Sequence, residues 1–251
     1  MNTELMKFLI LRTLLLLKAD QVDSVPVDFG SGFLLKYNNK EFVVTAAHLF
    51  DTNTIKVLIH LGNRPFQITR YNLNPFFFKL FELRKIKKYI AYFKKDFSIS
   101  EITKKKKDYD LAILDASLPI KPIYDFPNRL ATGLDKIVIE SELNVKPDPN
   151  ESYCFYSMGN YTKDENENIS LKEHFEFNLK FKEKRGEYLV FTNISDPEYD
   201  FHGSSGAPMF NSKNELISMI IKPGNCNEIL GLDLSEFKIA FDTMIKNEAQ
   251  T

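Results

Sequence analysis

The segment FHGSSGAPMF, residues 201–210, determines how the rest of this chain is interpreted. Two consecutive serines stand between glycines, immediately before an apolar run typical of a buried strand. A serine hydroxyl is a weak nucleophile until a neighbouring base removes its proton. Taken alone, the segment also fits a simple tight turn, so its meaning depends on the other polar residues that interrupt apolar strands.

Two such residues precede it. His48 lies near the end of FVVTAAHLF, residues 42–50, and Asp110 lies where the apolar part of KDYDLAILD, residues 107–115, begins. Histidine suits the task of a base because its pKa lies near neutrality, and a carboxylate behind the ring holds the required tautomer and stabilises the imidazolium. Either residue alone is more often structural. Together with the serine segment they complete the residue types of a nucleophile, a base and an orienting acid.

The order of these residues separates the folds that use them. In an α/β-hydrolase the nucleophile lies in G-x-S-x-G and precedes both partners. Here Ala207 takes the place of the last glycine, and the order is His48, Asp110, Ser205. In this order the sequence resembles the trypsin/chymotrypsin-like serine peptidases, in the style of disulfide-free bacterial members such as the glutamyl endopeptidases and the HtrA-type proteases. The motifs that carry the resemblance are GSGF at 30–33, TAAH at 45–48, DLAIL at 110–114 and GSSGAP at 203–208.

The resemblance covers about residues 25–240 and implies a role for each matched position. It implies that Ser205 is the nucleophile, that His48 is the general base and then the general acid, and that Asp110 orients His48. It also implies an oxyanion hole formed by the backbone N–H groups of Gly203 and Ser205. Ser204 is a rival nucleophile, but the register of the motif favours Ser205. The digestive enzymes carry Asp at the position of Ser204, so activation through a newly cut N-terminus is not expected.

Substrate preference follows less directly from the resemblance. Trypsins carry an acid six positions before the nucleophile, where this chain has Tyr199 followed by Asp200. Glutamyl endopeptidases place a histidine in the strand after the nucleophile, where this chain offers Met219 and Ile220. We therefore expect an apolar or small specificity pocket. Asp200 or His202 near its rim would instead favour a charged or polar substrate residue, although His202 also fits an ordinary surface position.

Hydrophobic patterning predicts an all-β fold, and the resemblance implies two antiparallel six-stranded β-barrels followed by a C-terminal helix. Short runs rich in β-branched and aromatic residues alternate with turn residues, such as Asn38-Asn39 and Arg185-Gly186. Ser235 is the expected N-cap of the last helix. We expect one peptidase domain over 1–251, with an N-terminal barrel at about 22–125, a C-terminal barrel at 133–234 and a helix at 235–251.

Residues 71–107 interrupt the first barrel with a different pattern, because apolar residues recur at helical spacing among many lysines. This basic insertion is expected to be either a solvated face or a surface that docks a regulatory protein partner. The whole chain has a net charge of −1, from 33 Lys+Arg and 34 Asp+Glu. This balance argues against a nucleic-acid partner, since proteins that neutralise phosphates are usually strongly basic.

The apolar run MKFLILRTLLLL, residues 6–17, is too short to span a bilayer and lacks a small-x-small cleavage pattern after it. A buried first helix or strand is therefore expected, and no membrane span. Cys154 and Cys226 match no metal spacing, which favours reduced thiols and a cytoplasmic location. Secretion is the alternative if residues 1–20 act as a signal.

No cofactor is expected. The sequence has no H-E-x-x-H motif, no Cys/His cluster and no glycine-rich phosphate loop, and His60 and His174 stand alone in strand-like contexts. Two functions remain. The first is a serine endopeptidase that hydrolyses a protein or peptide substrate through an acyl-enzyme. The alternative is a catalytically latent or inactive trypsin-like scaffold that acts as a binding or regulatory module.

Overall fold

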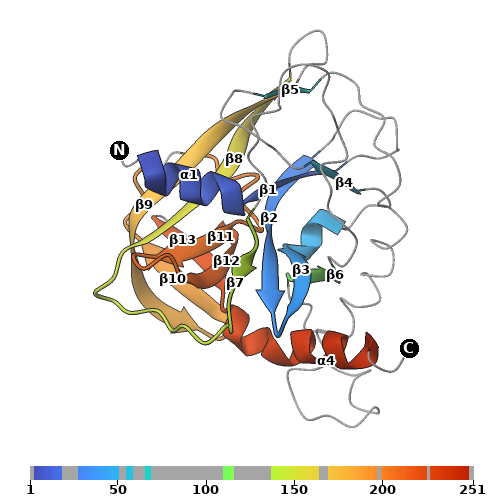
Figure 1. Cartoon of the computed structure of the whole chain (residues 1–251). Coiled ribbons are helices and arrows are strands. Elements are labelled where there is room, and N and C mark those ends of the chain that lie inside the picture. Colours follow the sequence, from blue (N-terminus) through green and yellow to red (C-terminus); the bar gives the residue numbers. More distant parts are fainter. Residues whose placement is uncertain are drawn as a thin grey trace, which may run out of the picture.

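The computed structural model describes residues 3–18, 28–50, 55–58, 66–68, 110–115, 137–163, 169–196, 199–224 and 227–248. These residues form mostly β-structure, with a helix near each end of the chain (Figure 1). The basic insertion at 71–107 and His60 lie outside the described residues, and so does Cys226.

The second half of the chain forms a closed antiparallel β-barrel of six strands. Strand β9 pairs with β8 on one side and with β10 on the other, and this second pairing closes the barrel. The predicted turn at Arg185-Gly186 joins β9 to β10, and Gly186 has a φ of 62°, which glycine adopts at no steric cost. The strands are β8 (Tyr153–Lys163), β9 (Ile169–Arg185), β10 (Tyr188–Thr192), β11 (Pro208–Asn211), β12 (Leu216–Pro223) and β13 (Glu228–Leu232).

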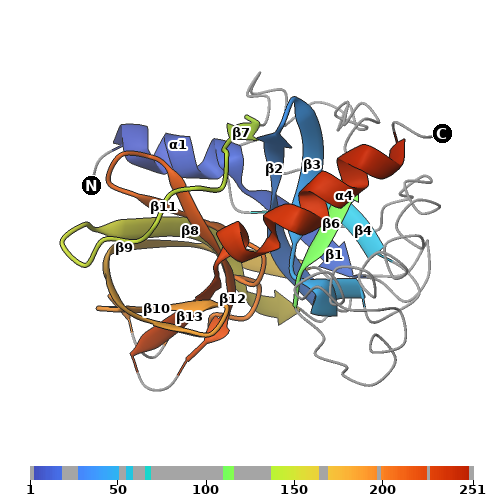
Figure 2. The ribbon, with the colours of Figure 1, turned by 90° about the horizontal axis from the view of Figure 1, so that it is seen from below.

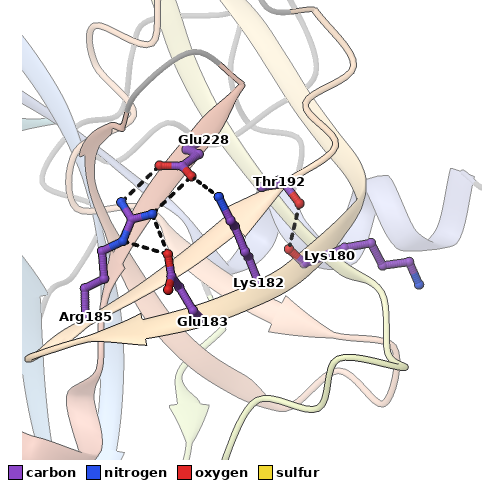
Figure 3. Close-up of polar contacts among 6 residues, drawn as sticks. All are labelled: Lys180, Lys182, Glu183, Arg185, Thr192 and Glu228. Carbon is purple, nitrogen blue, oxygen red and sulfur yellow. Dashed lines mark hydrogen bonds and ion pairs between the residues drawn. The ribbon is translucent and has the colours of Figure 1, made fainter.

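Charged side chains join strands β9 and β13 of this barrel. Glu228 of β13 accepts hydrogen bonds from Lys182 and Arg185 of β9, and Arg185 also pairs with Glu183 (Figure 3). In the same view Thr192 of β10 donates to the backbone carbonyl of Lys180. The hydrogen bonds from Lys182 and Arg185 hold the pKa of Glu228 below its ordinary value.

The lowered pKa of Glu228 makes its contribution to the free energy of unfolding depend on pH. The folded-state pKa is lowered, so the stabilisation is present above the ordinary value of about 4.3 and is lost as the pH falls through the folded-state value. Glu228→Gln should therefore lower the free energy of unfolding at pH 7 more than at about pH 3.5. Urea unfolding of both proteins at the two pH values measures this. An equal difference at both would contradict the prediction.

The described strands of the first half form an open sheet in the order β4-β1-β2-β3-β6, with β7 parallel to β2. The first predicted barrel is thus not shown as a closed barrel by these residues. Strand β5 (Phe66–Ile68) pairs instead with β9 of the second half. The predicted turn at Asn38-Asn39 is confirmed, with φ values of 48° and 62° typical of a two-residue hairpin. The strands are β1 (Leu14–Lys18), β2 (Asp28–Tyr37), β3 (Lys40–Thr45), β4 (Ile55–Leu58), β6 (Ala112–Asp115) and β7 (Ile139–Glu140).

The N-terminal apolar run divides into helix α1 (Thr3–Arg12) and strand β1. Phe8 of α1 packs edge-on against Phe210 of β11, with ring centroids 5.0 Å apart. Strand β1 pairs with β2, so the first sheet begins before residue 22, the expected boundary of the N-terminal barrel. Among the helices that the structure describes, none is long and apolar enough to cross a membrane.

The C-terminal helix differs from its prediction. The N-cap is Asp233, whose side chain accepts from Ser235 N and caps a 3-10 turn at Leu234–Phe237. Ser235 lies inside that turn, and helix α4 (Lys238–Glu248) follows. In Figure 2, α4 runs from the barrel across β2 and β3, where Phe241 contacts the rings of Tyr37 and Phe42. This helix therefore helps to seal one core shared by the barrel and the open sheet.

Candidate active site

His48 and Asp110 are brought together by the pairing of β3 with β6. Thr45 lies opposite Ala112 in this pair, so the turn after β3, Ala47–Phe50, lies near Asp110, two residues before β6 begins. Asp110 Oδ2 lies 2.7 Å from His48 Nδ1, and Asp110 Oδ1 accepts from the His48 backbone N–H at 2.8 Å. A carboxylate only accepts, so Nδ1 carries the proton and Nε2 of the neutral ring is left as the acceptor. The pair has the geometry of a general base with its orienting acid.

Ser205 lies on the loop before β11, half-buried, and its hydroxyl donates to the carbonyl of Ile221 at 2.5 Å. Within the described part of the chain, no hydrogen bond joins Ser205 to His48. Catalytic hydrogen bonds are often loose before substrate binds, so this geometry does not remove Ser205 from consideration. The loop lies against the sheet that carries His48, because Ser31 N of β2 donates to the Ser205 carbonyl at 2.8 Å.

Ser204 faces the interior. It is almost fully buried, and its hydroxyl shares a 2.8 Å hydrogen bond with that of Ser157 on β8. Its N–H donates to the Phe201 carbonyl at 2.9 Å. By contrast, the N–H groups of Gly203 and Ser205 make no hydrogen bond within the residues described. This alternation leaves two N–H groups able to serve as oxyanion donors, as the resemblance implies.

The four residues expected at the specificity pocket fall into two pairs. Tyr199 and Ile220 are buried in one apolar cluster of the barrel with Ile229. Asp200 and His202 are exposed: Asp200 accepts from the His202 N–H at 3.0 Å, and the His202 ring packs edge-on against Phe29. Tyr199, Asp200 and His202 precede Gly203 in the chain, and the Ile220 carbonyl accepts from Gly206 N at 2.7 Å. Only Asp200 and His202 are accessible on the surface.

Sequence reasoning missed a buried pair on β9. His174 does not stand alone, since its Nε2 lies 3.1 Å from Glu176 Oε2 and its ring stacks on Tyr199 at 3.7 Å. The other carboxylate oxygen of Glu176 accepts from Ser195 N at 2.7 Å. A signal was present, because His174 and Glu176 are two apart on a strand and therefore share a face. The pair therefore contacts Ser195 and Tyr199, which precede the serine loop in the chain.

Tyr199 is held tightly in this region. Its hydroxyl has no hydrogen-bond partner in the described structure, and a Cβ placed on Gly159 would lie only 2.3 Å from it. Burial raises the pKa of the Tyr199 phenol, and the charge of Asp200 adds to the shift. The Tyr199 phenol is therefore neutral, and its ring packs in the apolar interior of the barrel.

Loss of Glu176 should be costly. Glu176→Ala would leave Ser195 N and His174 without their buried partner, which we expect to lower the free energy of unfolding by about 3–5 kcal/mol. Glu183→Ala is the matched control on the same strand, because this half-exposed side chain should contribute about 1 kcal/mol or less. Denaturant unfolding compares the two. Equal losses of unfolding free energy in the two variants would show that the buried contacts of Glu176 stabilise the fold no more than the exposed contact of Glu183 does.

The described residues offer no group of three or more His, Cys, Asp or Glu side chains that could hold a metal ion. Cys154 is a free, buried thiol, and burial raises its pKa to about 12, so it is a poor nucleophile at neutral pH.

No protein-family model matches the sequence, and no curated protein matches it. Among solved structures the fold is similar to that of the serine endoprotease from Yersinia pestis, with a TM-score of 0.50 and 14% sequence identity. The match covers 96% of this chain and 64% of that chain. The fold is that of a protease-like scaffold. At this identity the likeness speaks for the fold, and the chemistry rests on this chain's own residues.

Proposed function

We propose that this protein is a serine endopeptidase. The observation that carries the proposal is the double hydrogen bond from Asp110 to the ring and backbone of His48, on a sheet whose neighbouring strand holds the Ser205 loop. An aspartate that uses both oxygens on one histidine fixes the ring's position and tautomer together, which a base needs and a structural histidine does not. The protease-like fold supports the proposal.

The chemistry follows from these groups. His48 Nε2 takes the Ser205 hydroxyl proton as the oxygen attacks the peptide carbonyl, and Asp110 stabilises the imidazolium that forms. The N–H groups of Gly203 and Ser205 bind the negative oxygen of the tetrahedral intermediate. His48 then donates its proton to the leaving amine, and water hydrolyses the acyl-enzyme by the reverse proton path. The Ser205 hydroxyl must first leave the Ile221 carbonyl to which it now donates.

The preferred substrate side chain is small or apolar. Tyr199, Ile220 and Ile229 pack in one apolar cluster of the barrel, and even a Cβ on Gly159 would collide with the Tyr199 hydroxyl. A long or charged side chain entering there would have to displace packed apolar groups. Asp200 and His202 on the exposed side are the residues that would contact a polar neighbour in the substrate.

A second candidate function is a latent or inactive scaffold that binds a partner. The observation that favours it is the Ser205 hydroxyl, which donates to Ile221 and not to His48. A protein of this kind would keep the fold and the His48–Asp110 pair but would need a bound partner to align the serine. For the active peptidase we also propose a cytoplasmic location and a regulatory protein partner at 71–107, because a protease among cellular proteins must be restrained.

The test is covalent labelling by a fluorophosphonate followed by exposure to a diverse peptide library read by mass spectrometry. Labelling at Ser205 together with cuts beside small or apolar residues would establish the peptidase. Labelling without cuts would indicate an enzyme with a demanding substrate or a missing activator. If the protein shows neither labelling nor cuts, the binding scaffold becomes the favoured function.

A further inference from the structure

We infer that Ser31 is a positioning residue for the oxyanion hole, because it holds the backbone on both sides of Ser204 and Ser205 in one orientation. The inference rests on the proposed peptidase function. Ser31 lies on β2, in the first half of the chain, 172 residues from the loop that it contacts. It is 1% exposed, so its polar groups are committed to these contacts.

Ser31 makes two hydrogen bonds to alternate carbonyls of the serine loop. Its hydroxyl donates to the Gly203 carbonyl at 2.8 Å, and its N–H donates to the Ser205 carbonyl at 2.8 Å. The backbone N–H is free to do this because the pairing of β2 with β3 ends at Gly32 opposite Thr45, one residue away. The serine loop of the second half thus takes the place of a partner strand for β2 beyond the point where its pairing with β3 ends.

These contacts fix whole peptide groups. A peptide plane carries the carbonyl of one residue and the N–H of the next, so both ends must be held to prevent it from turning over. The Gly203–Ser204 peptide is held by Ser31 at its carbonyl and by Phe201 O at its N–H. The Ser205–Gly206 peptide is held by Ser31 N at its carbonyl and by Ile220 O at its N–H.

The peptide between these two is held at one end only. The Ser204 carbonyl accepts from Ala207 N at 3.0 Å, while the Ser205 N–H at the other end makes no hydrogen bond in the described structure. Ser31 fixes both neighbouring planes, so this peptide can turn over only on its own, by breaking the hydrogen bond from Ala207 N to the Ser204 carbonyl. By fixing the neighbouring planes, Ser31 helps to keep the Ser205 N–H available as an oxyanion donor before substrate binds. Such preorganised donors stabilise the negative charge that develops in the transition state.

Thr45 and Gly206 complete the contact. The Thr45 hydroxyl donates to the Ser31 carbonyl at 2.6 Å, and Thr45 stands three residues before His48. A Cβ on Gly206 would lie 1.8 Å from the Ser31 carbonyl, and Gly206 has a φ of 91°, so only glycine lets the loop approach this closely. The strand that leads to the base and the loop that carries the nucleophile are thus joined through one residue.

The test is Ser31→Ala, which removes the hydroxyl contact and leaves the backbone contact. We expect kcat to fall by roughly 10- to 100-fold, somewhat less than for loss of a direct oxyanion donor, with KM changed by less than about threefold. A peptide aldehyde forms a tetrahedral adduct on the serine whose oxygen occupies the same hole. Its affinity should fall by the same factor as kcat, which a merely structural role would not produce.

Thr13→Val is the matched control. It removes a buried hydroxyl that donates to the Leu9 carbonyl at 3.1 Å, far from the loop in the sequence, and conserves shape. It should lower Tm without altering kcat or aldehyde affinity. If Ser31→Ala does not fold, Thr45→Val, which removes only the bond to the Ser31 carbonyl, should show the same pattern with a smaller factor.

Two outcomes overturn the inference in different ways. Ser31→Ala and Thr45→Val with lower Tm but unchanged kcat and aldehyde affinity would show that Ser31 is only structural, while the peptidase assignment stands. A wild-type protein with neither turnover nor fluorophosphonate labelling would overturn the proposed function and this inference with it.

Discussion

Ser205→Ala is expected to lower kcat by about 10⁶-fold, the loss seen when the nucleophile of a Ser-His-Asp triad is removed alone. Alanine has no oxygen to form the acyl-enzyme, so only binding and the oxyanion donors remain to accelerate hydrolysis. The fold should be retained, because the Ser205 side chain is half-buried and, among the described residues, makes one hydrogen bond, to the Ile221 carbonyl. Turnover of a peptide found in the library, measured beside Tm, tests both statements.

Ser204→Ala is the natural control, since it removes the neighbouring hydroxyl. That hydroxyl is buried against Ser157 and points away from solvent, so labelling should persist and kcat should change by much less. The variant should lose about 1–2 kcal/mol of stability, because the Ser157 hydroxyl loses its partner. Loss of labelling in Ser204→Ala with labelling retained in Ser205→Ala would mean that the nucleophile has been misassigned.

Asp110→Asn is expected to lower kcat by roughly 10⁴-fold while the protein stays folded. The carboxylate accepts two hydrogen bonds, from the ring and the backbone N–H of His48, whereas an amide offers one oxygen and one NH₂ group. If the amide oxygen keeps the backbone contact, the NH₂ group faces Nδ1 and forces its proton onto Nε2. The ring then presents a donor to Ser205, and the base is lost.

The pH dependence separates this explanation from simple disorder. At high pH, hydroxide can assist the attack that His48 no longer supports, so the Asp110→Asn rate should continue to rise where the wild-type rate has levelled. A variant that had merely lost its structure would not recover in this way. An Asp110→Asn protein with wild-type kcat would show that His48 is oriented by other contacts and would remove Asp110 from the catalytic set.

Much of the fold could be predicted from local pattern. The Asn38-Asn39 turn and the Arg185-Gly186 turn were predicted because each places turn residues between strands of opposite direction, and both are confirmed. The N-cap of the C-terminal helical segment was predicted at Ser235, two residues after the observed cap, because serine and aspartate are both good caps. Asp233 is the cap, since the strand β13 ends one residue before it.

The buried polar groups could not be predicted in the same way. His174 and Glu176 alternate with Phe175 and Phe177, a pattern that places polar residues on one face and aromatic residues on the other. By hydrophobicity the aromatic face should be interior, yet the polar pair is buried and both phenylalanines are only partly so. The reason lies in the tertiary contacts: Ser195 N hydrogen-bonds to Glu176 and the Tyr199 ring stacks on His174. These contacts offset the cost of removing the two polar side chains from water.

The sequence by itself determined the residue types and their order: a histidine and an aspartate at the margins of apolar strands, and a serine between glycines. Local composition suffices for this, because such residues are costly inside strands and stand out where they occur. The tertiary structure alone decided which partners they meet. Asp110 reaches His48 through the register of β3 with β6, Ser204 turns to Ser157 while Ser205 does not, and Ser31 holds the loop from the other half. Hydrogen bonds between residues so distant in sequence form only when the pairing of strands and the packing of the two halves bring them together, and no local pattern encodes those contacts.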